Sequence, residues 1–245
     1  MVAYKNHGPV GFDTHWGYPF DRGTLARTQS PWPGILSELK EAQKLLLEFK
    51  KTMTGHESRI AAVLRSDSAN RVDFTIGESA VNKTLMDEVA NAIEKGTVKI
   101  KLGSSGGGFR ASYTSWKGRR PSPETTGRTG ELTVNVGALP TMQGQVDVFH
   151  ESVHALKDIQ NYRIDRHQDE ALAFLADTVF WLSLNKDLPA HQQTSFPTSG
   201  EAAPIYQASN ALVKAKDMLD KPGAILKWSE CDGLVKAIRQ VRGYK

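Results

Sequence analysis

The chain has 245 residues, which is enough for one large domain or for a compact domain with an N-terminal extension. Its hydrophobic fraction of 39% recurs in periodic runs of Leu, Ile, Val and Phe, which excludes a wholly disordered chain. The net charge of +4 comes from Lys and Arg scattered among acidic residues, a pattern that favours solubility and does not indicate nucleic-acid binding.

Cysteine usage and apolar runs bear on the compartment. Cys231 is the one cysteine, so no disulfide can form within the chain, which suits a reducing cytosol or export that needs no disulfides. Met1–Pro19 lacks a charged segment followed by an apolar one, and no apolar run approaches the roughly 20 residues that span a bilayer. We expect a protein that is cytoplasmic when synthesised, or one that is secreted without a signal peptide.

The N-terminal part is expected to form an arm followed by a helix. Met1–Pro33 is rich in Gly, Pro and aromatic residues without a regular period, which predicts an irregular N-terminal arm. Ile35–Met53 has apolar residues at helical spacing, which predicts an amphipathic helix. A single domain is then expected over residues 34–245.

Helices and strands alternate in the next part of the prediction. Ser58–Arg65 continues with helical spacing, and Arg71–Ile76 alternates apolar and polar residues as a strand does. Ser79–Glu94 returns to helical spacing. Gly96 is a typical residue to close that helix, because glycine readily adopts the left-handed conformation.

Three strands are expected in the middle of the chain, at Thr97–Leu102, Phe109–Trp116 and Glu131–Val136. Ser104–Gly108 has the composition of a hairpin loop, which predicts that the first two strands pair with each other. A phosphate-binding loop at Gly103–Gly108 is the alternative. It is disfavoured because the Gly-Lys-Ser/Thr ending is missing and no helix follows.

The remainder is predicted to be helical. Two long helices are expected at about Met142–Gln160 and His167–Leu184. Further helices are expected over Gly200–Leu219 and Ala224–Val241. The order of elements predicts an α+β fold, with a small mixed or antiparallel sheet, a helix pair that carries the active site and a helical C-terminal part.

A chemically specific motif, His150-Glu151-Ser152-Val153-His154, lies in the first long helix. Histidines four residues apart lie on one helical face, so both imidazoles can reach one metal ion. Glu151 can act as a base toward a water molecule without being a ligand itself. Zinc in catalytic sites takes three protein ligands and leaves a fourth position open, so Zn²⁺ is the expected cofactor.

The alternative is two histidines that happen to lie one turn apart. Two imidazoles on an apolar helix face are costly to bury without a partner, so a metal is favoured. The helix itself is predicted independently of the motif, by the apolar residues Val146, Phe149, Val153, Leu156 and Ile159.

A third ligand is expected from the second long helix. Its apolar stripe predicts packing against the first helix, and a short loop permits an antiparallel return that brings Glu170 opposite His154. Asp169 is the neighbouring alternative and points about 100° away on an ideal helix. Glu170 could instead be an acid that the helix dipole favours near a helix start.

The residues from Phe149 to Asp177 resemble the active-site helices of the gluzincins, the metallopeptidase group that includes thermolysin. In that group the third ligand is a Glu followed by Ala on the next helix, which corresponds to Glu170-Ala171. This helix is also similar to one in bacterial repressor-cleaving metallopeptidases. Where thermolysin has an acid that orients a ligand imidazole, this chain has Phe174, and we expect Asp177 or Asp158 to take that role.

The resemblance implies a zinc-dependent metallopeptidase that hydrolyses a protein or peptide substrate. Glu151 would be the catalytic general base, with His150, His154 and Glu170 as metal ligands. A donor to the oxyanion is also required. The candidates for that donor are Tyr162, His167, His191 and Tyr206.

By the same resemblance, a strand before the metal helix binds the substrate as an added β-strand. Glu131–Val136 and Phe109–Trp116 are the two candidates for that strand.

Several biological roles stay open. The aromatic arm and the lack of an attached DNA-binding module favour a secreted effector or toxin, whose partners would include an immunity protein or a secretion apparatus. A regulatory protease that cleaves a repressor is the second interpretation. In the non-enzymatic alternative, the chain is an interaction protein with a structural or vestigial metal site, and Glu151 has no catalytic role.

Overall fold

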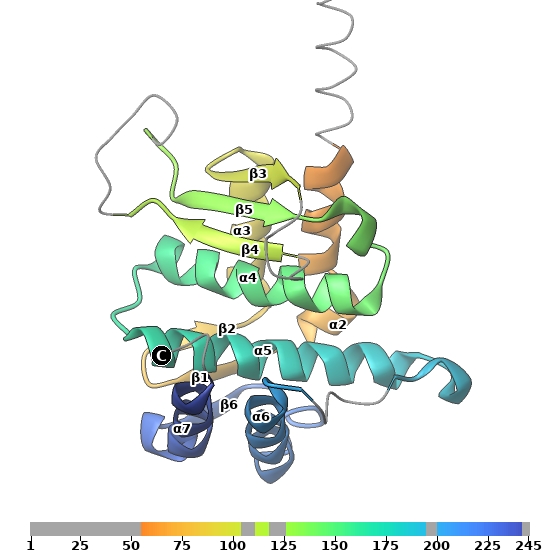
Figure 1. Ribbon diagram of the computed structural model, residues 1–245, viewed down its shortest axis with the longest axis vertical. Coiled ribbons are helices and arrows are strands. Elements are labelled where there is room, and N and C mark those ends of the chain that lie inside the picture. The colour runs from red at the N-terminus through yellow and green to blue at the C-terminus, as the bar shows by residue number, and fades with distance from the viewer. Residues whose placement is uncertain (1–54, 104–110, 118–125, 195–199, 242–245) are drawn as a thin grey trace, which may run out of the picture. The chain divides into compact units, whose positions relative to one another are not determined.

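The computed structural model describes residues 55–103, 111–117, 126–194 and 200–241 (Figure 1). The chain divides into two units, Met1–Leu47 and Glu48–Lys245. The predicted arm and the predicted helix Ile35–Met53 lie outside the described residues. The single domain expected over residues 34–245 stays a prediction.

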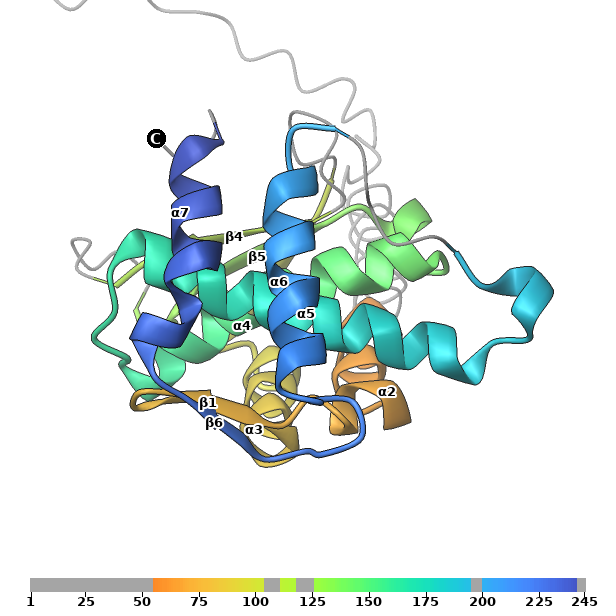
Figure 2. The same cartoon turned by 90° about the horizontal axis from the view of Figure 1, so that it is seen from below.

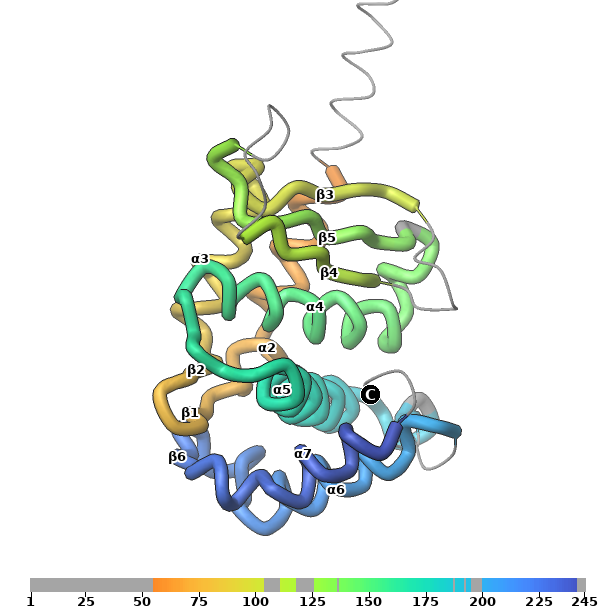
Figure 3. Tube along the Cα trace, turned by 60° about the vertical axis from the view of Figure 1, so that its left-hand side comes forward, coloured from red at the N-terminus to blue at the C-terminus, as the bar shows by residue number. Residues whose placement is uncertain are grey.

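The fold is α+β, as the sequence predicts, and its described residues form two three-stranded sheets. The helix pair α4 (Met142–Gln160) and α5 (Arg166–Asp187) packs between one sheet and the C-terminal helices α6 (Ala203–Ala215) and α7 (Asp232–Gln240). Figures 1 and 3 show this layering, and Figure 2 shows α6 and α7 crossing α5. None of the helices described is both long and apolar enough to cross a membrane.

The sheet beside α4 contains β3 (Val98–Leu102), β4 (Ala111–Ser115) and β5 (Gly130–Val134) in the order β3-β5-β4. β5 is parallel to β3 and antiparallel to β4. The predicted hairpin between the first two strands is therefore wrong, because β5 lies between them. β5 completely buries Leu132 and Val134, a pattern that suits the centre of a sheet, whereas the more polar β4 suits an edge.

The second sheet has the order β2-β1-β6, with β1 at Phe74–Ile76 and β2 at Ser79–Val81. Gly77, with φ 61°, connects these two strands in a tight turn. The helix expected from Ser79 is therefore wrong at its start. It is α3 (Lys83–Glu94), and it begins where the Asn82 side chain accepts the Leu85 N–H.

The C-terminal prediction also needs one correction. Ala224–Leu226 is not helical but forms β6, which pairs in parallel with β1. Helix α7 follows only at Asp232, after a 3₁₀ turn at Trp228–Cys231. The main chain of β6 obtains its hydrogen bonds from a strand about 150 positions earlier, and helical spacing in the local sequence does not reveal this pairing.

Other predicted elements are confirmed. Residues 55–64 are helical, and the short helix α2 follows at Asp67–Asn70. Gly96, with φ 74°, closes α3 as expected, and its N–H bonds to the Ile93 carbonyl. The remaining short elements are the 3₁₀ turns η2 (Val136–Ala138) and η3 (Ala190–Gln192).

The two central helices have well-defined ends. The Thr141 side chain caps the start of α4, and Asn161 ends it in the left-handed conformation, so the predicted bounds are confirmed. Asp165 and Gln168 form a capping box at the start of α5. The short connection of residues 161–165 turns the chain back, so the two helices lie antiparallel (Figure 1).

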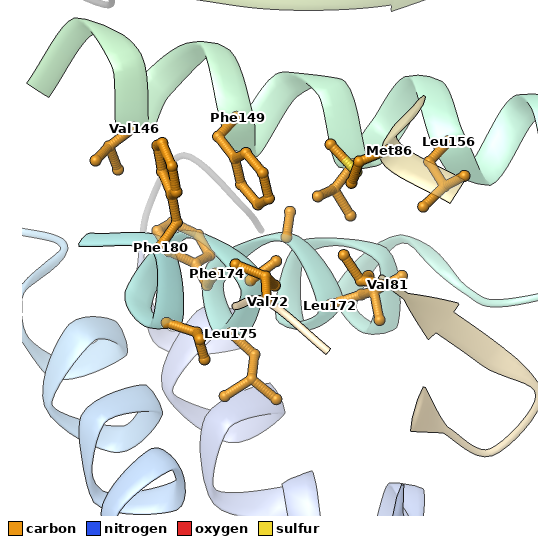
Figure 4. Packing of buried hydrophobic residues seen from close by; sticks show 14 of the residues in the cluster. Val72, Val81, Met86, Val146, Phe149, Leu156, Leu172, Phe174, Leu175 and Phe180 are labelled. Atoms are coloured by element: carbon orange, nitrogen blue, oxygen red, sulfur yellow. The ribbon is translucent and has the colours of Figure 1, made fainter. Parts of the chain in front are cut away.

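A continuous apolar core joins the helix pair. The rings of Phe149 on α4 and Phe180 on α5 stack with their centroids 4.4 Å apart, and both are fully buried. Figure 4 shows these rings between the helices, with Leu172 and Leu175 along α5. This packing fixes how the polar faces of the two helices meet at the site.

Candidate metal centre

The facing sides of α4 and α5 bring three potential metal ligands together. His150 and His154 come from successive turns of α4, and Glu170 comes from the first turns of α5. Glu170 Oε2 lies 3.6 Å from His150 Nε2 and 3.8 Å from His154 Nε2. One ligand atom from each residue lies within 4.8 Å of the others, so this group could hold a metal ion.

The spacing suits a small tetrahedral cation. Zinc binds nitrogen and oxygen at about 2 Å, which places neighbouring ligand atoms roughly 3.3 Å apart in a tetrahedron. The separations of 3.6 and 3.8 Å between Glu170 Oε2 and the two Nε2 atoms exceed this by a few tenths of an ångström. On the two sides that Glu170 forms, the ligand atoms are therefore close to the separations of a tetrahedral site, and all three ligand atoms lie within 4.8 Å of one another.

Each imidazole has a carboxylate next to its other nitrogen, within hydrogen-bond geometry for His150 and as a close ion-pair contact for His154. His150 Nδ1 lies 2.9 Å from Asp177 Oδ2, and His154 Nδ1 lies 3.1 Å from Asp169 Oδ1. The second oxygen of Asp169 accepts from Lys157 Nζ at 2.9 Å. Carboxylates in these positions orient the ring and leave Nε2 free to face the centre.

Three buried atoms of the site have no hydrogen-bond partner within the described residues: Glu170 Oε2, and the facing atoms His154 Nδ1 and Asp169 Oδ1. Glu170 Oε2 is buried and accepts no hydrogen bond within the described ranges. A buried carboxylate oxygen without a partner is costly, and a cation between it and the two Nε2 atoms would remove that cost. The donor set, two imidazoles and one carboxylate, is also one that zinc accepts in catalytic sites.

The electrostatics favour positive charge at the two imidazoles. Burial disfavours the charged form of His150, but the hydrogen bond to Asp177 and the nearby Glu170 carboxylate outweigh it and raise its pKa well above the usual value. The pKa of His154 is also raised: burial lowers it, but the nearby Asp169 carboxylate raises it by more. Burial raises the pKa of Asp177 to about 6, although its bond to His150 opposes this shift.

Glu151 lies on α4 between the two histidines, and its carboxylate reaches the neighbouring sheet. Its Oε2 accepts the main-chain N–H of Tyr113 on β4 at 2.7 Å. Burial raises the pKa of Glu151, while the two nearby imidazoles act in the opposite direction. The carboxylate is thus held beside the three potential ligands.

Two adjoining cavities open onto these residues. The larger, of about 400 Å³, is lined by β4, by α4 from His150 to Asp158 and by the start of α5 including Arg166. The smaller, of about 60 Å³, borders His150 and Glu151 and is lined by Phe174 and Tyr206. An extended chain could lie in the first, and the second could take a small group beside the centre.

Of the four residues predicted as possible oxyanion donors, one lines a cavity at the centre. Tyr206 lines the smaller cavity, and its ring contacts Phe174 edge-on at 5.4 Å between centroids. The Tyr162 hydroxyl instead donates to the Ala80 carbonyl at 2.8 Å. Tyr162, His167 and His191 are absent from the described lining of both cavities at the centre.

The structure also distinguishes between the two strands that were predicted to bind substrate. β5 is paired with β3 on one edge and with β4 on the other, so no main-chain edge of Glu131–Val136 is left for an added strand, and that prediction is wrong. β4 is an edge strand, and Ser112, Tyr113 and Ser115 line the larger cavity. Of the two alternatives, β4 has an edge that pairs with no other described strand.

Sequence reasoning missed two contributions. Asp169 was considered only as a rival ligand, yet it contacts His154. Tyr113 was not singled out, although it contacts both Glu151 and Asp158. Of the two residues expected to orient an imidazole, Asp177 contacts His150. A signal for Asp177 was available, because a residue seven positions after Glu170 lies on the same helical face.

No protein-family model, no curated protein and no solved structure matches the chain. The geometry of the site therefore carries the functional interpretation.

Proposed function

We propose that the chain is a zinc-dependent metallopeptidase of the gluzincin type. The observation that carries this proposal is the triangle formed by His150 Nε2, His154 Nε2 and Glu170 Oε2, with the unpartnered carboxylate oxygen facing the two imidazoles. In this proposal these three residues are the metal ligands, and Asp177 and Asp169 orient the two rings.

A bound zinc ion would supply Lewis-acid polarisation of a substrate carbonyl and of a water molecule. Glu151 would accept a proton from that water and later pass it to the leaving amine. Its Oε2 is already engaged by the Tyr113 amide, which leaves the other carboxylate oxygen for the water. Burial raises the pKa of Glu151, which suits a group that must both accept and release a proton near neutral pH.

The proposed substrate is an extended polypeptide segment. β4 offers a free strand edge along the larger cavity, and an added strand could pair with it. Tyr206 is the proposed donor to the oxyanion, because it lines the small cavity that His150 and Glu151 also border.

Glu151→Gln tests the proposal. The amide keeps the shape of the side chain but cannot accept the proton, so the variant should retain zinc and lose hydrolysis of quenched fluorescent casein by at least about 100-fold. Zinc is measured by elemental analysis. Glu131→Gln on β5, where Lys99 and Lys101 flank the carboxylate, is the matched control and should hydrolyse casein as the wild type does.

Equal hydrolysis by Glu151→Gln and the wild type would exclude a catalytic role for Glu151. A zinc-loaded wild type without any hydrolysis would instead favour the non-catalytic interaction protein. The effector and repressor-cleaving roles stay predictions, because no observation within the described part of the chain distinguishes them.

A further inference from the structure

We infer that Tyr113 is a positioning residue, which fixes the carboxylate of Glu151 and the distance between the substrate-binding strand and the metal helix. The inference rests on the proposed metallopeptidase function. It concerns how this chain holds its general base, since a base must lie within hydrogen-bond reach of the proton it takes.

Tyr113 connects β4 to α4 through two hydrogen bonds. Its main-chain N–H donates to Glu151 Oε2 at 2.7 Å, and its hydroxyl donates to Asp158 Oδ2 at 3.0 Å. Glu151 and Asp158 are seven residues apart, about two helical turns, so they lie on the same face of α4. One strand residue therefore binds the metal helix at two points along its length.

The strand register explains why this amide is available. The Trp116 N–H bonds to the Thr129 carbonyl, so the even-numbered residues of β4 face β5. The main chain of Tyr113 consequently faces the free edge, where a substrate strand would pair. Glu151 occupies this N–H, so a substrate strand that pairs with β4 would receive no hydrogen bond from it, and the proposed base meets the strand at this residue.

Gly130 makes room for the tyrosine ring. A Cβ atom built on Gly130 would lie 2.2 Å from the Tyr113 hydroxyl oxygen and 2.7 Å from the Thr114 carbonyl oxygen. The ring thus crosses over the glycine on its way to Asp158. This path requires the smallest residue at the start of β5.

The first test measures the amide contact directly, without any activity. Hydrogen exchange of the Tyr113 amide, followed by NMR, should accelerate by about tenfold or more in Glu151→Ala, because an edge amide without a partner is exposed to solvent. In Glu151→Gln the side-chain carbonyl can still accept, so the protection should largely remain. The Leu132 amide in the sheet centre is the internal control. Unchanged Tyr113 exchange in Glu151→Ala would contradict the inference.

The second test measures hydrolysis of quenched fluorescent casein by the zinc-loaded protein. Tyr113→Phe and Asp158→Ala should each lower kcat by about tenfold with little change in KM, since each removes the hydrogen bond between the Tyr113 hydroxyl and Asp158 and so misplaces the base. The double variant should be no worse than either single one, because both remove the same contact. Tyr162→Phe is the matched control, since its hydroxyl bonds to Ala80 outside the site.

The two failures are distinguishable. A wild type that does not hydrolyse casein refutes the proposed function, whatever the amide exchange shows. A wild type that is active, together with a Tyr113→Phe variant of equal kcat or with a change in KM alone, refutes only the positioning role.

Discussion

At the residue scale, the contact between Asp177 and His150 has a measurable consequence. Asp177 is almost fully buried, and its Oδ2 lies 2.9 Å from His150 Nδ1. Asp177→Ala should weaken zinc binding by about 10–100-fold, because the imidazole loses the group that orients it. Competition with a fluorescent chelator measures the affinity. Asp220→Asn, which alters an exposed pair with Lys186, is the control, and equal affinities in all three proteins would contradict the assigned role.

Much of the site can be predicted because it is encoded locally. The i, i+4 spacing of His150 and His154 holds wherever the residues are helical, and Glu170 follows from a short loop and an antiparallel return. The contacts of Asp169 and Tyr113 were not predicted. They depend on how α5 is rotated about its axis relative to α4 and on the distance between β4 and α4. Tertiary packing determines both, and the local spacing of residues does not reveal them.

At the element scale, the start of α4 depends on a close approach to the preceding turn. A Cβ atom built on Gly144 would lie 2.0 Å from the Ala138 carbonyl oxygen. Gly144→Ala should lower the free energy of unfolding by about 1–3 kcal/mol, because the clash with the Ala138 carbonyl costs more than the gain in helix propensity from alanine. Urea unfolding followed by circular dichroism measures this. Gly137→Ala, whose nearest contact is an ordinary 3.5 Å, is the control, and equal stability of both variants would contradict the argument.

The success of element prediction follows element length and pairing. α4 is predicted at both ends because its nineteen residues show a clear period and its caps are local. β2 and β6 have three residues each, too few to show alternation, and both were predicted to be helical. The order β3-β5-β4 was missed because a glycine-rich connection suggests a hairpin, whereas pairing with β5 is a tertiary choice.

At the scale of the whole molecule, metal binding and stability should be linked. α4 and α5 each contribute potential ligands, so an ion that binds only the folded chain would stabilise it, by about 2.7 kcal/mol at a free concentration 100 times Kd. For a chain of this size this corresponds to a rise in Tm of about 5–10 °C. Differential scanning fluorimetry with and without zinc, and after chelator treatment, measures the shift. A Tm that is independent of zinc in the wild type would contradict the linkage.

The measurement that tests the central claim most directly is zinc content per chain after saturation and desalting, in the wild type and in His150→Ala. The account predicts about one tightly held ion per wild-type chain and a large loss in the variant, because one of three ligands is removed. A correctly folded wild type that holds no zinc, or a variant that holds as much as the wild type, would contradict the metal centre and the hydrolase interpretation that depends on it.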